Sequence, residues 1–125
     1  MIFRYARHTT DLKRIEKFYT EIAGLQKLGS FEAHEEYDGI FLGIPGLDWH
    51  LEFTVSPDKP HSKFDEDDIL VFYKDSPAEL AAMRSIIERN QITLETPKNP
   101  YWSKYGLMIS DPDGYKIMFA LKHQS

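Results

Sequence analysis

The sequence predicts an α+β fold made of two tandem modules, each with a strand, a helix and three further strands. Strand-like and helix-like patterns occur in the same order in both halves of the 125-residue chain, at an offset of about 64–66 residues. Each helix-like stretch begins at a residue type that caps helices. One module cannot easily bury both its helix and its sheet, so we expect two curved mixed sheets to pack around a shared cavity.

The composition restricts the classes of function. The net charge is −5 and the basic residues are scattered, so we expect no nucleic-acid partner. The absence of cysteine excludes disulfides and thiolate chemistry. No apolar run approaches the ~20 residues that span a membrane, and the N-terminus lacks a signal-peptide pattern. We therefore expect a cytoplasmic protein with no membrane partner.

The first module is predicted over about residues 1–56. Residues 2–8 alternate in polarity as a strand does. Thr10 and Asp11 both offer a helix N-cap, and Gly24 offers the stop. The apolar side chains between them have helical spacing: Leu12, Ile15, Phe18, Tyr19 and Ile22. Three strand-like runs follow, over residues 25–32, 37–43 and 48–55.

A polar linker, residues 56–66, is predicted to precede the second module, residues 66–122. A strand over 68–74 leads to a helix that is capped by Ser76, starts at Pro77, and has Glu79 in capping-box position. Asn90 is the expected C-cap. We predict a short strand over 92–95, a loop over 97–106, and a hairpin of residues 106–110 and 115–122.

Two motifs connect this pattern with a known superfamily. They are Asp11-Leu12 with Phe18-Tyr19 and Gly24-Leu25, and the turn Asp111-Pro112-Asp113-Gly114 before the last strand. In this order and spacing the chain resembles the glyoxalase/bleomycin-resistance/dioxygenase (vicinal oxygen chelate) superfamily. The resemblance implies one glyoxalase-like domain over residues 1–125, a small-molecule ligand and a homodimer.

The resemblance also places four cavity positions that usually hold a divalent metal. Here they are Arg4, Glu52, Asp68 and Met118. An arginine has no lone pair to give to a metal, and a thioether suits hard ions poorly. We therefore expect no metal and no cofactor, with Arg4 between the carboxylates of Glu52 and Asp68 as a charge cluster. The fallback is a divalent metal on Glu52, His50 and His8.

The candidate site residues follow from strand parity and from the aromatic loop. Glu52 is the candidate catalytic base, with His50 beside it on the same face. The candidate ligand-binding side chains are Arg4, Asp68, Phe72, Tyr101, Trp102 and Met118. Several of them have a structural alternative. It is an ion pair for Arg4 and Glu52, the end of the acidic linker for Asp68, a hydrogen-bonded histidine at His50, and a hydrophobic plug or dimer contact for Tyr101 and Trp102. For His8, a surface or helix-capping histidine is favoured.

Three functions remain open from the sequence. One is a metal-independent lyase or isomerase in which Glu52 is the base and Arg4 holds an oxyanion. The second is a ligand-sequestering protein that resembles the bleomycin-resistance members. The third is a metal-dependent lyase of the glyoxalase I type or a ring-cleaving dioxygenase, which Arg4 and Met118 make the least supported. Whether the protein is an enzyme is left open.

Overall fold

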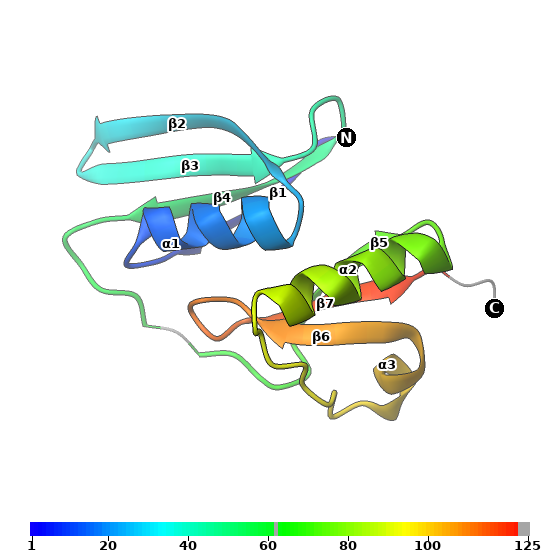
Figure 1. Ribbon diagram of the computed structural model, residues 1–125. Coiled ribbons are helices and arrows are strands. Elements are labelled where there is room, and N and C mark those ends of the chain that lie inside the picture. Colours follow the sequence, from blue (N-terminus) through cyan, green and yellow to red (C-terminus); the bar gives the residue numbers. More distant parts are fainter. Residues whose placement is uncertain (62, 123–125) are drawn as a thin grey trace. The chain divides into compact units, whose positions relative to one another are not determined.

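The computed structural model describes residues 1–61 and 63–122 and contains two compact units, Met1–Ser62 and Lys63–Ser125. We call them the N-terminal and C-terminal units and describe each by itself (Figure 1). The boundary falls inside the polar stretch 56–66. That the two units form one domain stays a prediction. Within the described residues, no helix is long and apolar enough to cross a membrane.

The N-terminal unit has the predicted order of strand, helix and three strands. Its elements are β1 (Phe3–His8), α1 (Leu12–Lys17), the π-helical turn η1 (Phe18–Ile22), β2 (Gln26–His34), β3 (Tyr37–Gly43) and β4 (Trp49–Val55). The sheet order is β1-β4-β3-β2, with β1 parallel to β4 and the other pairs antiparallel. Helix α1 covers one face of this sheet (Figure 1).

The helix of this unit forms where the sequence predicts it. Asp11, not Thr10, is the N-cap, and its Oδ1 accepts a hydrogen bond from the Arg14 backbone N–H at 3.1 Å. Gly24, at a φ of +82°, ends the helix. The change to π geometry at Phe18 was not predicted. It coincides with a 2.7 Å bond from Thr20 Oγ1 to the Glu16 carbonyl, a contact that perturbs helical backbone bonding.

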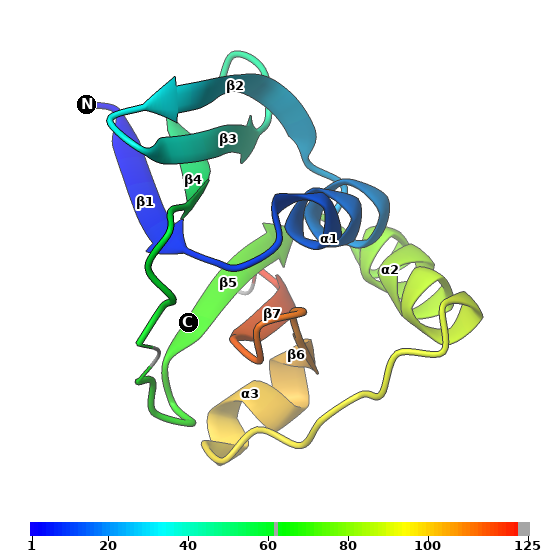
Figure 2. The same cartoon turned by 90° about the vertical axis from the view of Figure 1, so that its left-hand side faces the viewer.

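The C-terminal unit contains three strands and two helices. They are β5 (Ile69–Lys74), α2 (Pro77–Arg89), α3 (Pro100–Tyr105), β6 (Gly106–Ser110) and β7 (Lys116–Leu121). The sheet order is β5-β7-β6, with β5 parallel to β7 and β6 antiparallel to it. Helices α2 and α3 lie on different sides of this sheet (Figure 2).

The segment between α2 and β6 differs from the prediction in two places. Residues 92–95 form no strand, since only Glu95 makes a bridge, its N–H donating to the Met108 carbonyl at 2.8 Å. The predicted loop contains α3, which starts at Pro100 with Asn99 as its N-cap. Asparagine followed by proline is a helix start, so this signal was present in the sequence and was missed.

The caps predicted at both ends of α2 and the turn of the last hairpin are confirmed, but the capping box at Glu79 is not formed. Ser76 caps α2 through its Oγ, and Glu79 accepts the backbone N–H of Asp75, one residue earlier than a capping box requires. Asn90 is the C-cap of α2. In the β6–β7 hairpin, Asp111 Oδ1 accepts the N–H groups of Asp113 and Tyr115 at 2.9 and 3.0 Å.

Candidate functional site

The candidate site lies on the face of the N-terminal sheet opposite α1. Strand alternation buries Leu51 and Phe53 of β4 on the helix side, at 5% and 0% exposure, and so turns His50 and Glu52 to the other face. The parallel register sets Arg4 beside His50 and Ala6 beside Glu52. Arg4, His50 and Glu52 therefore share one face of the sheet, as predicted.

Arg4 is held by three contacts at this face. Its Nε donates a hydrogen bond to Nε2 of His50 at 2.8 Å. One terminal nitrogen, Nη1, lies 3.6 Å from Oε1 of Glu52, so the predicted contact between these two residues is present. The guanidinium carbon stands 5.0 Å from the centre of the Phe41 ring, which is a cation–π arrangement. The bond to His50 holds the Nε edge of the guanidinium, and the contact with Phe41 holds its plane.

The hydrogen bond from Arg4 sets the role of Nε2 of His50. An arginine Nε–H can only donate, so Nε2 accepts with its lone pair. The other ring nitrogen, Nδ1, is the donor in this arrangement. His50 therefore acts here as a holder of Arg4, and its Nε2 is not available to take a proton from a substrate while that bond exists.

Glu52 is the less hydrogen-bonded of the two candidate catalytic groups. Its side chain is 15% exposed, while that of Arg4 is 50% exposed. The 3.6 Å separation from Arg4 is an ion pair too long for a hydrogen bond. Within the part of the chain that the structure describes, no other ion pair or hydrogen bond engages this carboxylate. A carboxylate placed in this way can remove a proton from a bound molecule, while the neighbouring guanidinium polarises an adjacent group of that molecule.

An aromatic row borders Arg4, and the sequence reasoning missed it. The rings of Phe31 and Phe41 have centroids 5.8 Å apart, and Phe41 meets His50 edge-to-face at 5.9 Å. Gly39 makes room for the row, since a Cβ there would come within 2.4 Å of Phe31. The signal was the alternation in β3, in which Ile40 and Leu42 are buried and Phe41 must face the other way.

His8 lies too far along β1 to join His50 and Glu52. Its register partner is Thr54, four residues from His50, which is about 13 Å along a strand. Its Nε2 instead lies 3.1 Å from Ser56 Oγ, and the cap of α1 is Asp11, so His8 is not a helix cap. Among residues 1–61 and 63–122, no three His, Asp or Glu side chains are grouped to hold a metal. With Arg4 at the first family position, this donor set does not fit a divalent ion.

Asp68 immediately precedes β5 in the C-terminal unit. Its Oδ2 accepts the backbone N–H of Asp65 at 3.0 Å, and its own N–H donates to the Asp65 carbonyl. The local role of this carboxylate is therefore to close a turn. A charge cluster that joins it to Arg4 and Glu52 stays a prediction.

The β5–β7 register corrects the predicted strand parity. Val71 pairs with Met118, whereas Phe72 pairs with Phe119 and stacks on it at 5.9 Å. Paired residues of neighbouring strands point to the same face, so Phe72 and Met118 lie on opposite faces and cannot line one wall. The even offset from Arg4 to Asp68 caused this error. Counted from the registers, the β5 residue in the place of Arg4 is Ile69.

The face that carries Met118 is covered by Trp102 of α3. Trp102 packs against a cluster of Met108, Met118 and Ala120, with Ile69 and Val71 beside it. Met118 is fully buried there, which supports the plug alternative for Trp102. Tyr101 is 45% exposed and meets Trp102 edge-to-face at 5.0 Å. Its role as a stacking platform for a ligand stays a prediction.

Solved structures share this arrangement of strands and helices. Glyoxalase I of Leishmania major, a trypanothione-dependent enzyme, aligns with a TM-score of 0.76 at 22% identity, over 97% of this chain and 86% of that chain. TnmS3, an antibiotic-binding protein of Streptomyces sp. CB03234, aligns with a TM-score of 0.70 at 20% identity, over 98% and 96%. At such identities the likeness concerns the fold. The chain is a member of the glyoxalase/vicinal oxygen chelate superfamily.

Family models and a relative of higher identity narrow this class. The YycE-like N-terminal domain matches residues 3–54, and the YycE-like C-terminal domain matches residues 67–120. The uncharacterized protein YycE of Bacillus subtilis (strain 168) is 40% identical over 121 residues, 93% of this chain and 84% of the relative. A Bacillus subtilis YycE crystal structure aligns with a TM-score of 0.85 at 38% identity, over 99% and 91%. The chain belongs to the YycE-like family.

Proposed function

We propose that the protein binds an anionic small molecule on the N-terminal sheet face without a metal, with Arg4 as the anchor. One observation carries the proposal. The Nε and the plane of this guanidinium are held by His50 and Phe41, while its terminal nitrogens make no hydrogen bond within the described residues. The two oxygens of a carboxylate fit that edge with two parallel hydrogen bonds, and a single enolate oxygen can accept from the same nitrogens. The Phe31–Phe41 row supplies an apolar aromatic surface beside it.

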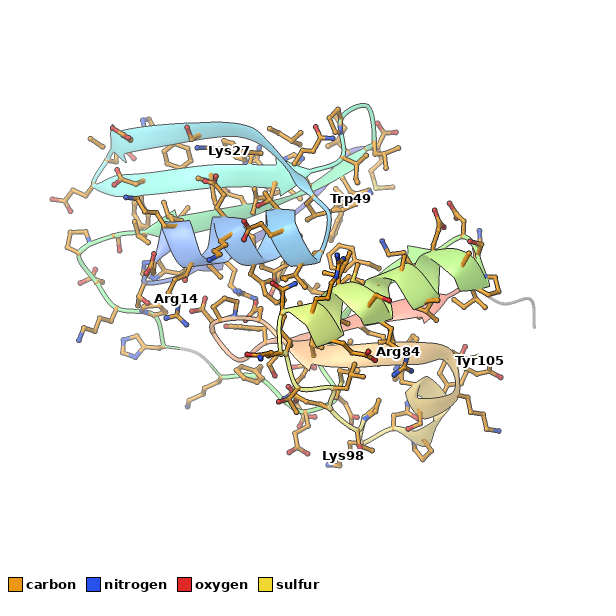
Figure 3. All side chains as sticks on the ribbon, viewed as in Figure 1. Arg14, Lys27, Trp49, Arg84, Lys98 and Tyr105 are labelled. Atoms are coloured by element: carbon orange, nitrogen blue, oxygen red, sulfur yellow. The ribbon has the colours of Figure 1, made fainter. Side chains whose placement is uncertain are left out.

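The binding half of the proposal is tested with benzoate, which has one ring and one carboxylate. In an NMR titration, benzoate should shift the amides around Arg4 and His50 saturably, and uncharged benzamide should not. Arg4→Gln should abolish the shifts, while Arg14→Gln, a matched change on α1 (Figure 3), should leave them unchanged. Treatment with a chelator should change nothing. Equal binding of benzoate by Arg4→Gln would refute the anchor.

Glu52 supports a second candidate function, in which bound ligand also reacts. The sheltered carboxylate next to Arg4 can remove a proton from a carbon beside a carbonyl. The C–H electron pair then forms a C=C bond, and the carbonyl oxygen becomes an enolate that Arg4 stabilises. Return of the proton to a different atom gives an isomer. We infer an isomerase on these grounds, a lyase where the enolate electron pair instead expels a leaving group from the neighbouring carbon, and pure sequestration where this step is absent.

Phenylpyruvate distinguishes the two candidates, because it joins a ring, a carboxylate and a ketone with exchangeable C–H bonds. An isomerase should accelerate exchange of those hydrogens in D2O, and Glu52→Gln should lose the acceleration. The same variant should bind benzoate more tightly, since a like charge has been removed. Binding of phenylpyruvate without accelerated exchange would favour sequestration for this ligand class.

The assembly state and location belong to the same proposal. The superfamily resemblance implies a homodimer, and sedimentation velocity of the purified chain tests it, since one species of monomer mass would contradict it. A cytoplasmic location stays a prediction from the sequence.

A further inference from the structure

The C-terminal unit contains an open cavity of about 410 Å³ that the proposed function does not use. It is lined by Glu66, Glu95, Thr96, Pro97, Lys98, Met108 and Lys116. Lys98 extends from the segment that leads to α3 (Figure 3). The volume is in the range of pockets for small metabolites. All lining residues belong to one unit, so the cavity is complete within it.

Lys116 is fixed at this cavity by two neighbours. Its ammonium donates to Oε1 of Glu95, and to Ser110 Oγ at 3.1 Å. Ser110 in turn donates to the other oxygen of Glu95 at 2.6 Å. Burial alone would raise the pKa of Glu95, but the bonds from Lys116 and Ser110 and the charge of Lys116 lower it. Glu95 is therefore ionised at neutral pH.

The third N–H of Lys116 has no acceptor within the described residues. An ammonium has three donors, and two of them are used by Glu95 and Ser110. The side chain of Lys116 is only 20% exposed. The direction of its remaining N–H is therefore fixed by the bonds to Glu95 and Ser110, unlike that of a mobile surface lysine. Because the residue lines the cavity, an oxygen of a ligand there can accept that proton.

The other charges of the cavity restrict the ligand further. Two lysines and two glutamates line it, so the formal charge of the lining is zero. Lys98 adds a second cation for a carboxylate, and Glu66 leaves one carboxylate with no cation bound to it in the described residues. Pro97 and Met108 supply an apolar wall. A neutral ligand with one group of each charge matches this lining better than a plain anion or cation does.

We propose that this cavity binds a zwitterion of the α-amino acid type. Its carboxylate lies on Lys116 and Lys98, its ammonium on Glu66, and its aliphatic part against Pro97 and Met108. Arg4 is not among its lining residues. Free amino acids and amino-acid-like metabolites carry the same pair of charged groups.

The test is an amide NMR titration of the whole chain with the standard amino acids, each added singly. At least one with an aliphatic side chain should saturably shift the amides of Glu95, Thr96, Lys98 and Met108. Its analogues that lack the amino group or the carboxylate should bind several-fold more weakly. Lys98→Gln and Glu66→Gln should each weaken binding several-fold, and Lys104→Gln, an exposed change outside the lining, should not.

Three results would overturn the proposal: no amino acid gives saturable shifts, the deaminated analogue binds equally well, or Lys98→Gln and Glu66→Gln leave binding unchanged. Lys116→Met removes one of the two cations proposed to bind the ligand carboxylate, so it should weaken binding. Circular dichroism checks that this variant is folded. Arg4→Gln should bind the amino acid normally. The two proposed sites can therefore fail independently of each other.

Discussion

Arg4 donates its Nε–H to Nε2 of His50 at 2.8 Å, across the parallel pair of β1 and β4. In both strands the side chains of these residues lie on the sheet face opposite α1. The bond turns the arginine so that its terminal nitrogens remain for a ligand, with Glu52 at 3.6 Å as the nearest counter-charge. The position that usually holds a metal ligand in the superfamily thus holds a cation whose orientation is set by a histidine.

His50→Phe removes the acceptor of this bond and keeps a ring of similar size beside Phe41. We expect benzoate binding to weaken several-fold, because the charged guanidinium of Arg4 loses the hydrogen bond that orients it. The fold should be retained, since His50 is not in the buried core. Affinity is measured by the same NMR titration. His61→Phe is the matched control, and an equal loss in both variants would contradict the positioning role.

Glu95 gives a prediction for the dependence of stability on pH. Its pKa is lowered from an ordinary value of about 4.5, so the folded state favours the ionised carboxylate. This contribution is complete above the unfolded-state pKa and is lost as the pH falls through the folded-state pKa. Glu95→Gln should therefore cost about 1 kcal/mol at pH 7. Urea unfolding at a series of pH values should show wild type and variant converging in acid.

Asp11 and Thr10 provide a test of local structure. Asp11→Ala should lower the free energy of unfolding by about 1 kcal/mol, since it leaves an N–H of the first turn of α1 without its acceptor. Thr10→Ala should cost less, because the side chain is exposed and does not cap the helix. Chemical denaturation measures both. A larger loss for Thr10→Ala would reverse the assignment of the cap.

Local signals accounted for most of the fold. The caps at Asp11 and Ser76 and the glycines at 24 and 114 act within a few residues, so a single sequence contains them. Residues 92–95 were misassigned because a short alternating run forms a strand only where a partner strand pairs along it. Here only Glu95 finds one, at Met108.

The site was predictable only in part, because parity within a strand is local and register between strands is not. Alternation placed His50 and Glu52 on one face, and the superfamily resemblance placed Arg4 beside Glu52. For β5, the offset between the two modules was wrong by one residue, so Asp68 was matched to Arg4 instead of Ile69. One step along a strand turns every side chain to the opposite face. The cavity beside Lys116 depends on a loop conformation that no local pattern determines.

Met118 provides the last prediction, because the resemblance puts a glutamate at its position in metal-binding relatives. Met118→Glu should not restore a metal site. The side chain is fully buried against Trp102 and Met108, so a carboxylate there would lose its hydration without gaining a partner. We expect a loss of about 3 kcal/mol or more in the free energy of unfolding. Met118→Leu, which conserves volume, should cost less than about 1.5 kcal/mol. Urea denaturation with and without Zn²⁺ measures both effects, and a Met118→Glu variant that is stable and stabilised further by Zn²⁺ would show that the face under Trp102 opens to a metal.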